Sequence, residues 1–398
     1  MKRMKMAIIG VGSRGEGLYR VALKKRDYVD FVAVCDRYED RCEAIATKMV
    51  EDGRPRPACY TDYRKCIDES KPDCILVATD WKYHVEITMY AMKRGIAVAC
   101  EVGGAYDLES LWDLVRCYEE TKTPVMMMEN CCYGRMELLA LEMKRRGLLG
   151  NIVHCEGGYR HDLRDEVARG KENRHYRLEE YKNRNCENYP THEIGPIARV
   201  LDINCGNRFV SLFSMASKSV GLPEFVKKNG LTQLEGIQFQ QADVVTTVIS
   251  CANGETVTIT LDTTLPRYYS RGFLVQGTEG LVCEENQSVF LEKDAGDDHW
   301  DWRPHFGNVD AYYQKYEHRI WQGYNPGEEG HGGMDGLVFD AFFKALDEGK
   351  PMPIDVYDMA TWMCISVLSE QSIQWGTVVE FPDFTQGAWK TRNNDFER

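Results

Sequence analysis

The feature that most constrains the fold is a glycine-rich turn, G-V-G-S-R-G over residues 10–15, directly after a short apolar run at residues 7–9. Its glycines are Gly10, Gly12 and Gly15, and a stretch with helical spacing follows. A strand, a tight glycine turn and a helix in this order are typical of the first unit of a doubly wound α/β domain. The turn therefore predicts a parallel sheet that begins near residue 7.

The first third of the chain repeats this alternation of short apolar runs and charged helical stretches. The further runs lie at residues 31–34, 74–77, 96–99 and 125–128. Continuous apolar strands of four residues, separated by helices, indicate a parallel sheet that is covered on both faces. We therefore expect a Rossmann domain over residues 1–128.

The remaining residues, 129–398, differ in character and predict a second, α+β domain for substrate binding and oligomerisation. A long polar insertion at 162–188 precedes strongly alternating segments at 242–249 and 256–261. Alternation of apolar and polar residues predicts strands of a large, mainly antiparallel open sheet. Two helical stretches near 334–348 and 356–375 follow, and the sequence leaves open whether they pack on the first domain.

An acidic residue supports a dinucleotide as the ligand of the glycine turn. Asp36 ends the second predicted strand, about twenty residues after the turn. The turn brings backbone N–H groups and a helix N-terminus to a pyrophosphate, and the carboxylate can accept hydrogen bonds from the adenosine ribose. Asp36 would repel a 2′-phosphate and so favours NAD, whereas the adjacent Arg37 leaves strict preference over NADP open.

Composition excludes several classes of protein. The net charge of −13 argues against nucleic acid, because binding phosphates requires clustered cations. The fifteen cysteines include no C-x-x-C spacing, so we expect reduced thiols rather than a metal site, although a role for the pair Cys131-Cys132 stays open. With no apolar run of membrane length and no leader-like start, we expect a cytoplasmic protein without a membrane partner.

Polar motifs stand where the third, fourth and fifth long parallel strands are expected to end. They read T-D-W-K-Y-H at 79–84, C-E-V at 100–102 and E-N at 129–130. Carboxyl ends of such strands are where open α/β sheets bind ligands. This arrangement resembles the glucose-fructose oxidoreductase and inositol dehydrogenase superfamily (Gfo/Idh/MocA).

Within that superfamily the chain is most similar to glycoside hydrolase family 109, the NAD-dependent α-N-acetylgalactosaminidase-like enzymes. The shared segments are E-V at 101–102, H-C-E-G-G-Y at 154–159, Y-P-T-H at 189–192, G-P at 195–196, Y-S at 269–270, V-Q-G-T at 275–278 and G-H-G-G-M-D at 330–335. They span nearly the whole chain. The resemblance implies a glycosidase that keeps NAD tightly bound and recycles it in each turnover.

Two differences from the ordinary dehydrogenases of the superfamily favour the resemblance to glycoside hydrolase family 109. Those enzymes usually have Glu-Lys-Pro where this chain has E-V-G at 101–103, so their substrate-binding lysine is missing. They also carry an aspartate four residues before the catalytic histidine, where this chain has Asn188. Departures from family 109, such as W-K-Y-H at 81–84 in place of W-E-W-H, leave the sugar, its anomer and the aglycone open.

The mechanism that the resemblance implies is hydrolysis through transient oxidation at C3 of the sugar. Oxidation makes the C2 proton acidic, the glycosidic oxygen is then eliminated, water adds, and C3 is reduced again. Neither the paired carboxylates of most glycosidases nor a metal is implied. We expect His192 to act as acid/base at the C3 hydroxyl, Tyr133 to remove the C2 proton, and Glu101 to orient ribose or substrate.

The resemblance also implies binding residues. Those expected at the sugar are Tyr159, Arg177, Tyr189, Pro190, Thr191, His192 and Tyr269. Those expected at the cofactor are Gly10, Gly12, Ser13, Arg14, Gly15, Asp36, Trp81, Lys82, Tyr83, His84, Glu101, Val102 and Asn130. Two alternatives stay open, because Arg177 lies in a charged run that could be a solvated surface, and His331 could serve only the entry of a helix.

Three functions therefore compete. The first is the NAD-dependent glycosidase acting on a small carbohydrate or glycoconjugate, the second a sugar or cyclitol dehydrogenase with net hydride transfer, and the third a non-catalytic nicotinamide-binding protein. The missing lysine argues against the second, and the Y-P-T-H motif against the third. The broad predicted sheet also favours a homo-oligomer.

Overall fold

The computed structural model describes residues 1–296 and 300–393, and these form two compact units. Unit 1 comprises Met1–Tyr133 and Gly323–Thr361, and unit 2 comprises Gly134–Gln322 and Trp362–Arg392. Residues 323–361 lie within the predicted second domain, 129–398, but they group with the N-terminal residues. The sequence alone leaves open whether the helical stretches near 334–348 and 356–375 pack on the first domain. The end of the predicted second domain, residues 394–398, lies outside the described residues.

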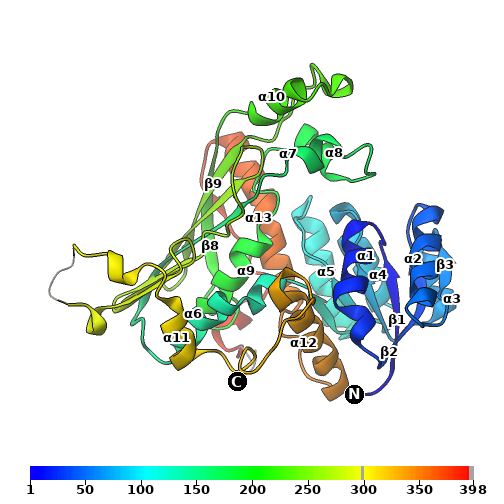
Figure 1. Ribbon diagram of the computed structural model, residues 1–398, viewed down its shortest axis with the longest axis horizontal. Helices are drawn as coiled ribbons and strands as arrows, with labels where there is room; N and C mark the ends of the chain where they lie inside the picture. The colour runs from blue at the N-terminus through cyan, green and yellow to red at the C-terminus, as the bar shows by residue number, and fades with distance from the viewer. Residues whose placement is uncertain (297–299, 394–398) are drawn as a thin grey trace. The chain divides into compact units, whose positions relative to one another are not determined.

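Unit 1 is built on a six-stranded parallel sheet with the strand order β3-β2-β1-β4-β5-β6 (Figure 1). The strands are β1 (Met4–Ile9), β2 (Val29–Cys35), β3 (Ala58–Tyr60), β4 (Cys74–Val77), β5 (Ala97–Cys100) and β6 (Val125–Met127). This order is that of the Rossmann fold, so the predicted doubly wound sheet is confirmed. Only β3 lacks an apolar signal in the sequence, because it is a short edge strand whose residues are all at least partly exposed.

Helices surround this sheet, and two of them begin at an aspartate cap. They are α1 (Ser13–Val21), α2 (Glu39–Glu51), α3 (Tyr63–Ser70), α4 (His84–Met92), α5 (Leu108–Thr121) and, from the C-terminal part of the chain, α12 (Met334–Glu348). The side chain of Asp62 accepts hydrogen bonds at the start of α3, and that of Asp107 does so for α5. Two short 3-10 turns, η2 (Trp81–Tyr83) and η3 (Asn130–Tyr133), follow β4 and β6.

Unit 2 contains an eight-stranded sheet with the order β13-β12-β11-β7-β10-β9-β8-β14. Its strands are β7 (Ile152–Arg160), β8 (Phe209–Ala216), β9 (Val244–Cys251), β10 (Thr256–Asp262), β11 (Leu274–Gly277), β12 (Gly280–Cys283), β13 (Ser288–Leu291) and β14 (Val379–Glu380). Every neighbouring pair is antiparallel except β7 and β10, which run parallel. The mainly antiparallel open sheet that the sequence predicts is confirmed.

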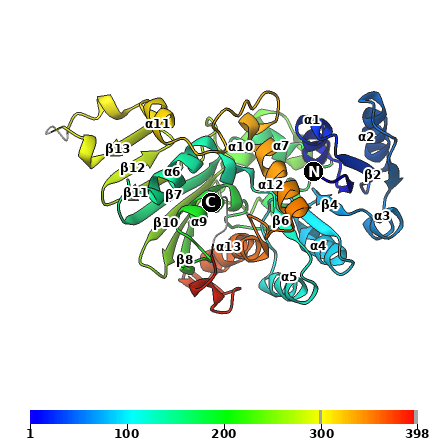
Figure 2. The same ribbon diagram turned by 90° about the horizontal axis from the view of Figure 1, so that it is seen from below.

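Helices cover one face of this sheet, where α9 packs on β7 and α6 packs on α9 (Figure 2). The helices of unit 2 are α6 (Arg135–Arg145), α7 (Arg164–Ala168), α8 (Arg177–Asn183), α9 (Thr191–Val200), α10 (Gly221–Lys228) and α11 (Val309–Tyr316). The polar insertion at 162–188 therefore forms α7 and α8. Helix α13 (Val356–Trp375) contributes its residues from Trp362 onward to this unit.

The alternation in β9 and β10 explains why only one sheet face is covered. Val245, Ile249, Val257 and Ile259 are fully buried, whereas their neighbours along each strand, such as Val248, stay at least partly accessible. Burial of the apolar side chains stabilises the sheet by about 25 cal/mol per Å² removed from water. The opposite face keeps hydroxyl-bearing and scattered apolar side chains and forms an open surface.

All fifteen cysteines are free thiols, and most are buried in the cores of the two units. Within the described residues, no helix is both long and apolar enough to cross a membrane.

Candidate active site

The glycine turn of unit 1 joins β1 to α1 as the sequence predicts. The backbone N–H of Gly10 donates to the carbonyl of Cys35 at 2.8 Å, which ties the turn to the end of β2. A Cβ atom on Gly15 would lie 1.9 Å from the carbonyl oxygen of Gly10. Only glycine at position 15 therefore lets α1 start this close to β1. The N–H groups at the N-terminus of α1 are then available to bind a pyrophosphate.

Asp36 is held in place by backbone groups at the end of β2. Its Oδ2 accepts a hydrogen bond from the N–H of Val11, and its Oδ1 accepts one from the N–H of Tyr38, both at 3.0 Å. The side chain is nearly buried, and Arg41 lies 3.9 Å from Oδ2. A carboxylate fixed in this way beside a glycine turn fits the ribose of NAD.

Arg14, the second residue of α1, bonds to two carboxylates of unit 1. Its guanidinium lies 3.2 Å from Glu101, which follows β5, and 3.0 Å from Asp335 in the first turn of α12. Asn130, which follows β6, donates its amide N–H to the same Asp335 at 2.8 Å. The structure thus brings together three predicted cofactor residues, Arg14, Glu101 and Asn130, around an aspartate that the site prediction omitted.

The side chains of segment 81–84 differ in solvent exposure. Lys82 and Tyr83 are exposed, whereas Trp81 is buried. His84 is only 1% exposed, and its Nε2 lies 3.0 Å from the carbonyl oxygen of Thr79. Burial lowers the pKa of His84 to about 4. Its imidazole is therefore a neutral part of the core of unit 1.

The remaining predicted residues of unit 1 are also placed by the fold. Ser13 is exposed at the start of α1, whereas Val102 is buried just after β5. Tyr133 ends η3 and is fully buried, as are Cys131 and Cys132. The role of Tyr133 in removing the C2 proton stays a prediction.

In unit 2 the Y-P-T-H motif forms the entry to α9. Pro190 precedes the first helical residue, Thr191 is fully buried, and His192 lies in the first turn. The Nε2 of His192 is 3.3 Å from the hydroxyl of Tyr189, and the two rings meet edge to face with centroids 4.9 Å apart. The tyrosine thereby orients the imidazole.

Two further predicted substrate residues, Tyr159 and Arg177, gather around this pair. The rings of Tyr159 and Tyr189 lie 4.3 Å apart, and Tyr159 contacts the ring of His192 at 5.7 Å. The guanidinium of Arg177 lies 5.1 Å from the centroid of the Tyr189 ring, within the range of a cation–π contact. A sheet strand, a helix of the insertion and the start of α9 thus converge on one aromatic and cationic cluster.

Arg177 is largely shielded from solvent, which excludes the solvated-surface alternative. Its side chain is 11% exposed, and Nη1 donates to Glu166 on α7 at 2.9 Å. Burial opposes the charge, but the facing tyrosines, Tyr159 foremost, and Glu166 hold the pKa of Arg177 well above its usual value. The cluster therefore carries a permanent positive charge that can bind polar oxygens of a sugar.

His161 joins this cluster and was missed from the sequence. Its Nδ1 lies 3.4 Å from the hydroxyl of Tyr159, and its ring meets that of the half-exposed Tyr269 at 5.2 Å. Burial, together with the charge of Arg177, lowers the pKa of His161. The signal for it was its spacing: His161 directly follows β7, its N–H still bonds to the carbonyl of Asp262, and a residue two positions after Tyr159 projects from the same face of extended backbone.

Two residues just before the motif support it from inside unit 2. The amide N–H of Asn188, at the position of the dehydrogenase aspartate, donates to Gln241 Oε1 at 3.1 Å. The neighbouring Glu187 is fully buried, and burial raises the pKa of its carboxyl well above the usual value. Neither residue offers a carboxylate base, so His192 is the group of this segment suited to proton transfer.

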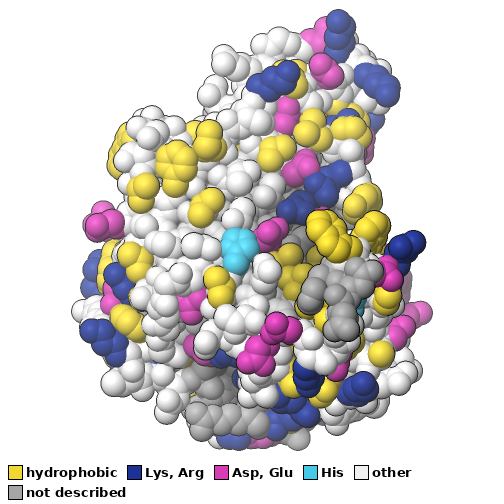
Figure 3. Space-filling model, turned by 90° about the vertical axis from the view of Figure 1, so that its left-hand side faces the viewer, with side chains coloured by type: hydrophobic (Ala, Val, Ile, Leu, Met, Phe, Trp, Pro, Cys, Tyr) yellow, Lys and Arg dark blue, Asp and Glu magenta, His cyan; other side chains and the backbone are white. Residues whose placement is uncertain are grey.

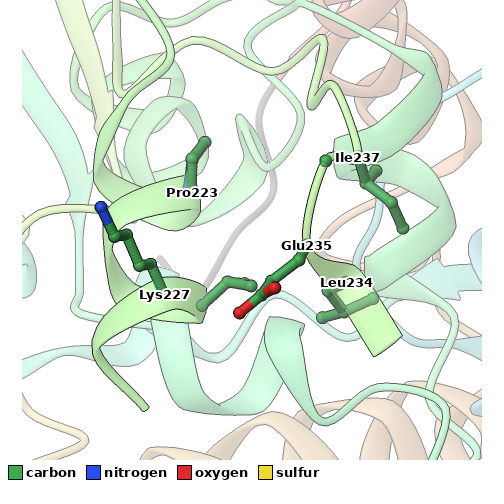
Figure 4. Close-up of a pocket in the computed structure, with 7 residues that line it drawn as sticks. Pro223, Lys227, Leu234, Glu235 and Ile237 are labelled. Atoms are coloured by element: carbon green, nitrogen blue, oxygen red, sulfur yellow. The ribbon is translucent and has the colours of Figure 1, made fainter. Parts of the chain in front are cut away.

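A separate pocket of about 330 Å³ lies beside α10 and the following 3-10 turn of unit 2 (Figure 4). Aliphatic side chains line most of it, and Lys227 and Glu235 supply its only charges. None of the predicted site residues contributes to its lining.

Comparison with protein families assigns both parts of the chain. Residues 133–391 match the model of the glycosyl hydrolase 109 C-terminal domain, and residues 4–129 match that of the oxidoreductase family with an NAD-binding Rossmann fold.

Curated relatives match over nearly the full length. A glycosyl hydrolase family 109 protein from Stenotrophomonas maltophilia is 38% identical, with 99% of this chain and 92% of that protein covered. An α-N-acetylgalactosaminidase from Tannerella forsythia is also 38% identical, over 99% of this chain and 88% of that protein.

Among solved structures, scyllo-inositol dehydrogenase from Lactobacillus casei with bound NAD(H) and scyllo-inositol aligns with a TM-score of 0.67 at 12% identity. The alignment covers 95% of this chain and 99% of that one. At this identity the likeness concerns the fold alone.

Proposed function

Because the chain belongs to glycosyl hydrolase family 109 and is an NAD-dependent glycosidase, we propose that it hydrolyses α-N-acetylgalactosaminides or closely related glycosides through transient oxidation at C3. The observation that carries this is the match of the family model to residues 133–391, which contain the Tyr189–His192–Arg177 cluster. The α-N-acetylgalactosaminidase from Tannerella forsythia, 38% identical, supports the substrate class.

The residues of unit 1 fit NAD. A Cβ on Gly15 would fill the turn, and Asp36 presents a fixed carboxylate at the ribose position. When bound, the cofactor supplies a reversible hydride acceptor for C3 of the sugar and is regenerated in each turnover. With such an acceptor the net reaction would be hydrolysis without accumulation of NADH.

His192 takes up the proton of the C3 hydroxyl as that carbon is oxidised and returns it when the carbon is reduced. The hydrogen bond with Tyr189 fixes the ring, and this positioning is a prerequisite of general acid–base catalysis, which contributes about 10²–10⁴-fold. Tyr159 and Tyr189 offer ring faces to the sugar, while Arg177 donates to its oxygens. Tyr269 lies at the edge of the cluster, where its ring contacts that of His161.

The C2 proton is assigned to Tyr133, and Glu101 is assigned the orientation of ribose or substrate. Loss of the C2 proton drives out the glycosidic oxygen from C1, which leaves with a proton as the free aglycone. Water then adds to the resulting double bond at C1 and restores the proton at C2. The net change is therefore the addition of one water molecule across the glycosidic bond, with OH at C1 of the sugar and a proton on the aglycone.

The test is turnover of an aryl α-N-acetylgalactosaminide in heavy water. We expect aglycone release, deuterium at C2 of the released sugar, and no stoichiometric rise of absorbance from NADH. Hydrolysis without deuterium at C2 would contradict the elimination, and stoichiometric NADH would identify a dehydrogenase instead.

A variant pair tests the role of His192. His192→Ala should lower turnover by about 10²–10⁴-fold while NAD still binds. The matched control is His305→Ala, because His305 lies in unit 2 and makes an edge-to-face contact with Phe290 outside the cluster. Equal activity of both variants would refute the assignment.

We also propose that the open face of the eight-stranded sheet mediates a homo-oligomer. Met215 and Val248 are 65% and 45% exposed there. In Figure 3 the upper left part of the face viewed carries several hydrophobic and few charged side chains, whereas Lys, Arg, Asp and Glu are common over the rest of that face. Light scattering should give a multiple of 45.7 kDa, and Val248→Asp should reduce it. A monomeric wild type would refute this.

The free state of all fifteen cysteines supports a reducing compartment, and we propose the cytoplasm. Cell fractionation tests this location.

A further inference from the structure

Asp335, in the first turn of α12, accepts four hydrogen bonds although it is 1% exposed. Its Oδ1 receives Arg14 Nη2 at 3.0 Å and Asn130 Nδ2 at 2.8 Å. Its Oδ2 receives Arg14 Nη1 at 3.2 Å and faces His331 Nδ1 at 2.8 Å. Each carboxylate oxygen therefore has two hydrogen-bond partners, all of them side chains of unit 1.

The preceding G-H-G-G turn is shaped around this carboxylate. Residues 330–333 all have positive φ angles, including 43° at His331, a conformation that side-chain-bearing residues rarely adopt. A Cβ on Gly330 would lie 2.4 Å from Asp335 Oδ2. The backbone thus makes room for the carboxylate and turns His331 toward it.

The groups that Asp335 binds come from separate strand ends of the parallel sheet. Arg14 follows β1 and Asn130 follows β6, and Arg14 also bonds to Glu101 after β5 at 3.2 Å. Asp36, which fits the adenosine ribose, follows β2 on the other side of β1. Since a dinucleotide lies across the carboxyl edge of such a sheet, the Asp335 cluster occupies its nicotinamide side.

We propose that Asp335 is a positioning residue of the NAD site, which holds Arg14 and Asn130 in the orientation that receives the nicotinamide half of the cofactor. Asp335 acts through these two side chains. Arg14 forms ion pairs with both Glu101 and Asp335, and these link α1, the end of β5 and α12. Because its charge is neutralised by two carboxylates, Arg14 is a structural link rather than a cation that binds a phosphate group.

The electrostatics of the cluster agree with a permanent link. Burial alone would raise the pKa of Asp335, but the hydrogen bond with His331 and the charge of Arg14 outweigh it and hold that pKa below its usual range. Burial likewise opposes the charge of Arg14, while Glu101 and Asp335 hold its pKa above the usual value. The ion pair therefore persists at neutral pH.

The test is the affinity of the NAD-free protein for NAD and for AMP, measured by calorimetry with Asp335→Asn. An amide has nearly the same shape, but its NH₂ group cannot accept from Arg14 or Asn130. We expect the Kd for NAD to rise at least about tenfold, which corresponds to about 1.4 kcal/mol, the range of a charged hydrogen bond. The Kd for AMP, which engages only the Asp36 side, should stay within about twofold on the same scale.

The matched control is Asp340→Asn. Asp340 lies on the same helix and bonds to Arg26 at 2.7 Å, but it contacts no predicted cofactor residue. We expect unchanged affinity for NAD even if thermal stability falls. Equal loss of NAD affinity in both variants, or equal loss for NAD and AMP in Asp335→Asn, would overturn the proposal.

Asp335→Glu covers the case in which the amide variant does not fold. It keeps the charge but displaces the carboxylate by one methylene, so NAD affinity should fall while AMP affinity is retained. An NAD affinity equal to that of the wild type would overturn the proposal. Because these measurements need no sugar, they are decided independently of the glycosidase activity and its substrate class.

Discussion

Buried His84 makes the stability of unit 1 depend on pH. Its ring is 1% exposed, its Nε2 bonds to the carbonyl of Thr79, and burial lowers its pKa to about 4. In the unfolded chain a histidine has a pKa of about 6.5. Between these two values the unfolded state binds more protons than the folded state, so the free energy of unfolding falls as the pH falls from 6.5 toward 4.

The magnitude follows from the two pKa values. The full effect, reached below pH 4, is about 2.5 units at 1.36 kcal/mol each, or about 3.4 kcal/mol. Between pH 7 and pH 5 the same pair of values gives a loss of about 1.8 kcal/mol. For a urea dependence near 3 kcal/mol per molar, this loss lowers the unfolding midpoint by roughly 0.6 M.

The assay compares urea unfolding of the NAD-free wild type and His84→Gln at pH 7 and pH 5, followed by circular dichroism. A glutamine amide can still donate to the carbonyl of Thr79 but does not titrate. Any packing defect of the variant affects both pH values equally and cancels in the difference. The buried His318, whose pKa burial also lowers to about 4, contributes equally to both proteins.

We expect the wild type to lose about 1.8 kcal/mol more than the variant between pH 7 and pH 5. An identical pH dependence of the two proteins would refute the reasoning, because it would mean that His84 takes up its proton as readily in the folded state as in the unfolded chain.

Three further predictions concern unit 1. Asp36→Ser should lower the ratio of NAD to NADP affinity at least about tenfold, because a charged acceptor for the ribose is lost; calorimetry with both cofactors measures it, and an unchanged ratio would contradict the role of Asp36. Asp107→Ala removes the bond to Ser110 N–H at 2.7 Å that caps α5 and should cost about 1 kcal/mol in urea unfolding, whereas an unchanged midpoint would show that the cap contributes nothing. Phe342→Ala, at a fully buried position of α12, should cost about 3–5 kcal/mol in the same assay, and a loss below 1 kcal/mol would mean that the core closes around the cavity.

The sequence predicted the parallel sheet well because its strands are buried on both faces. Continuous apolar runs such as residues 74–77 coincide with β4 to the residue. The edge strand β3 was missed because a three-residue, partly exposed strand needs no apolar run. In unit 2, β9 and β10 were visible as alternating segments, since one face of each strand is buried and the other is open.

The predicted substrate residues were located by motif, and the structure brings Tyr159, Arg177, Tyr189 and His192 into mutual contact. Their contacts could not be read from the sequence, because residues on β7, α8 and α9 meet only when the sheet and its helices pack. The same holds for His161, which directly follows β7 and contacts Tyr159.

By itself the sequence determined the local features: the glycine turn, Asp36 at the end of its strand, and the motifs that place the chain in its family. These depend on residues near one another in the chain, where backbone sterics and periodicity decide the conformation. Only the tertiary structure decided that Asp335 meets Arg14, which lies 321 residues earlier. Such a contact arises because α12, from the C-terminal part of the chain, packs against α1 and η3 of the first domain, and no local pattern encodes which distant carboxylate will neutralise the guanidinium of Arg14.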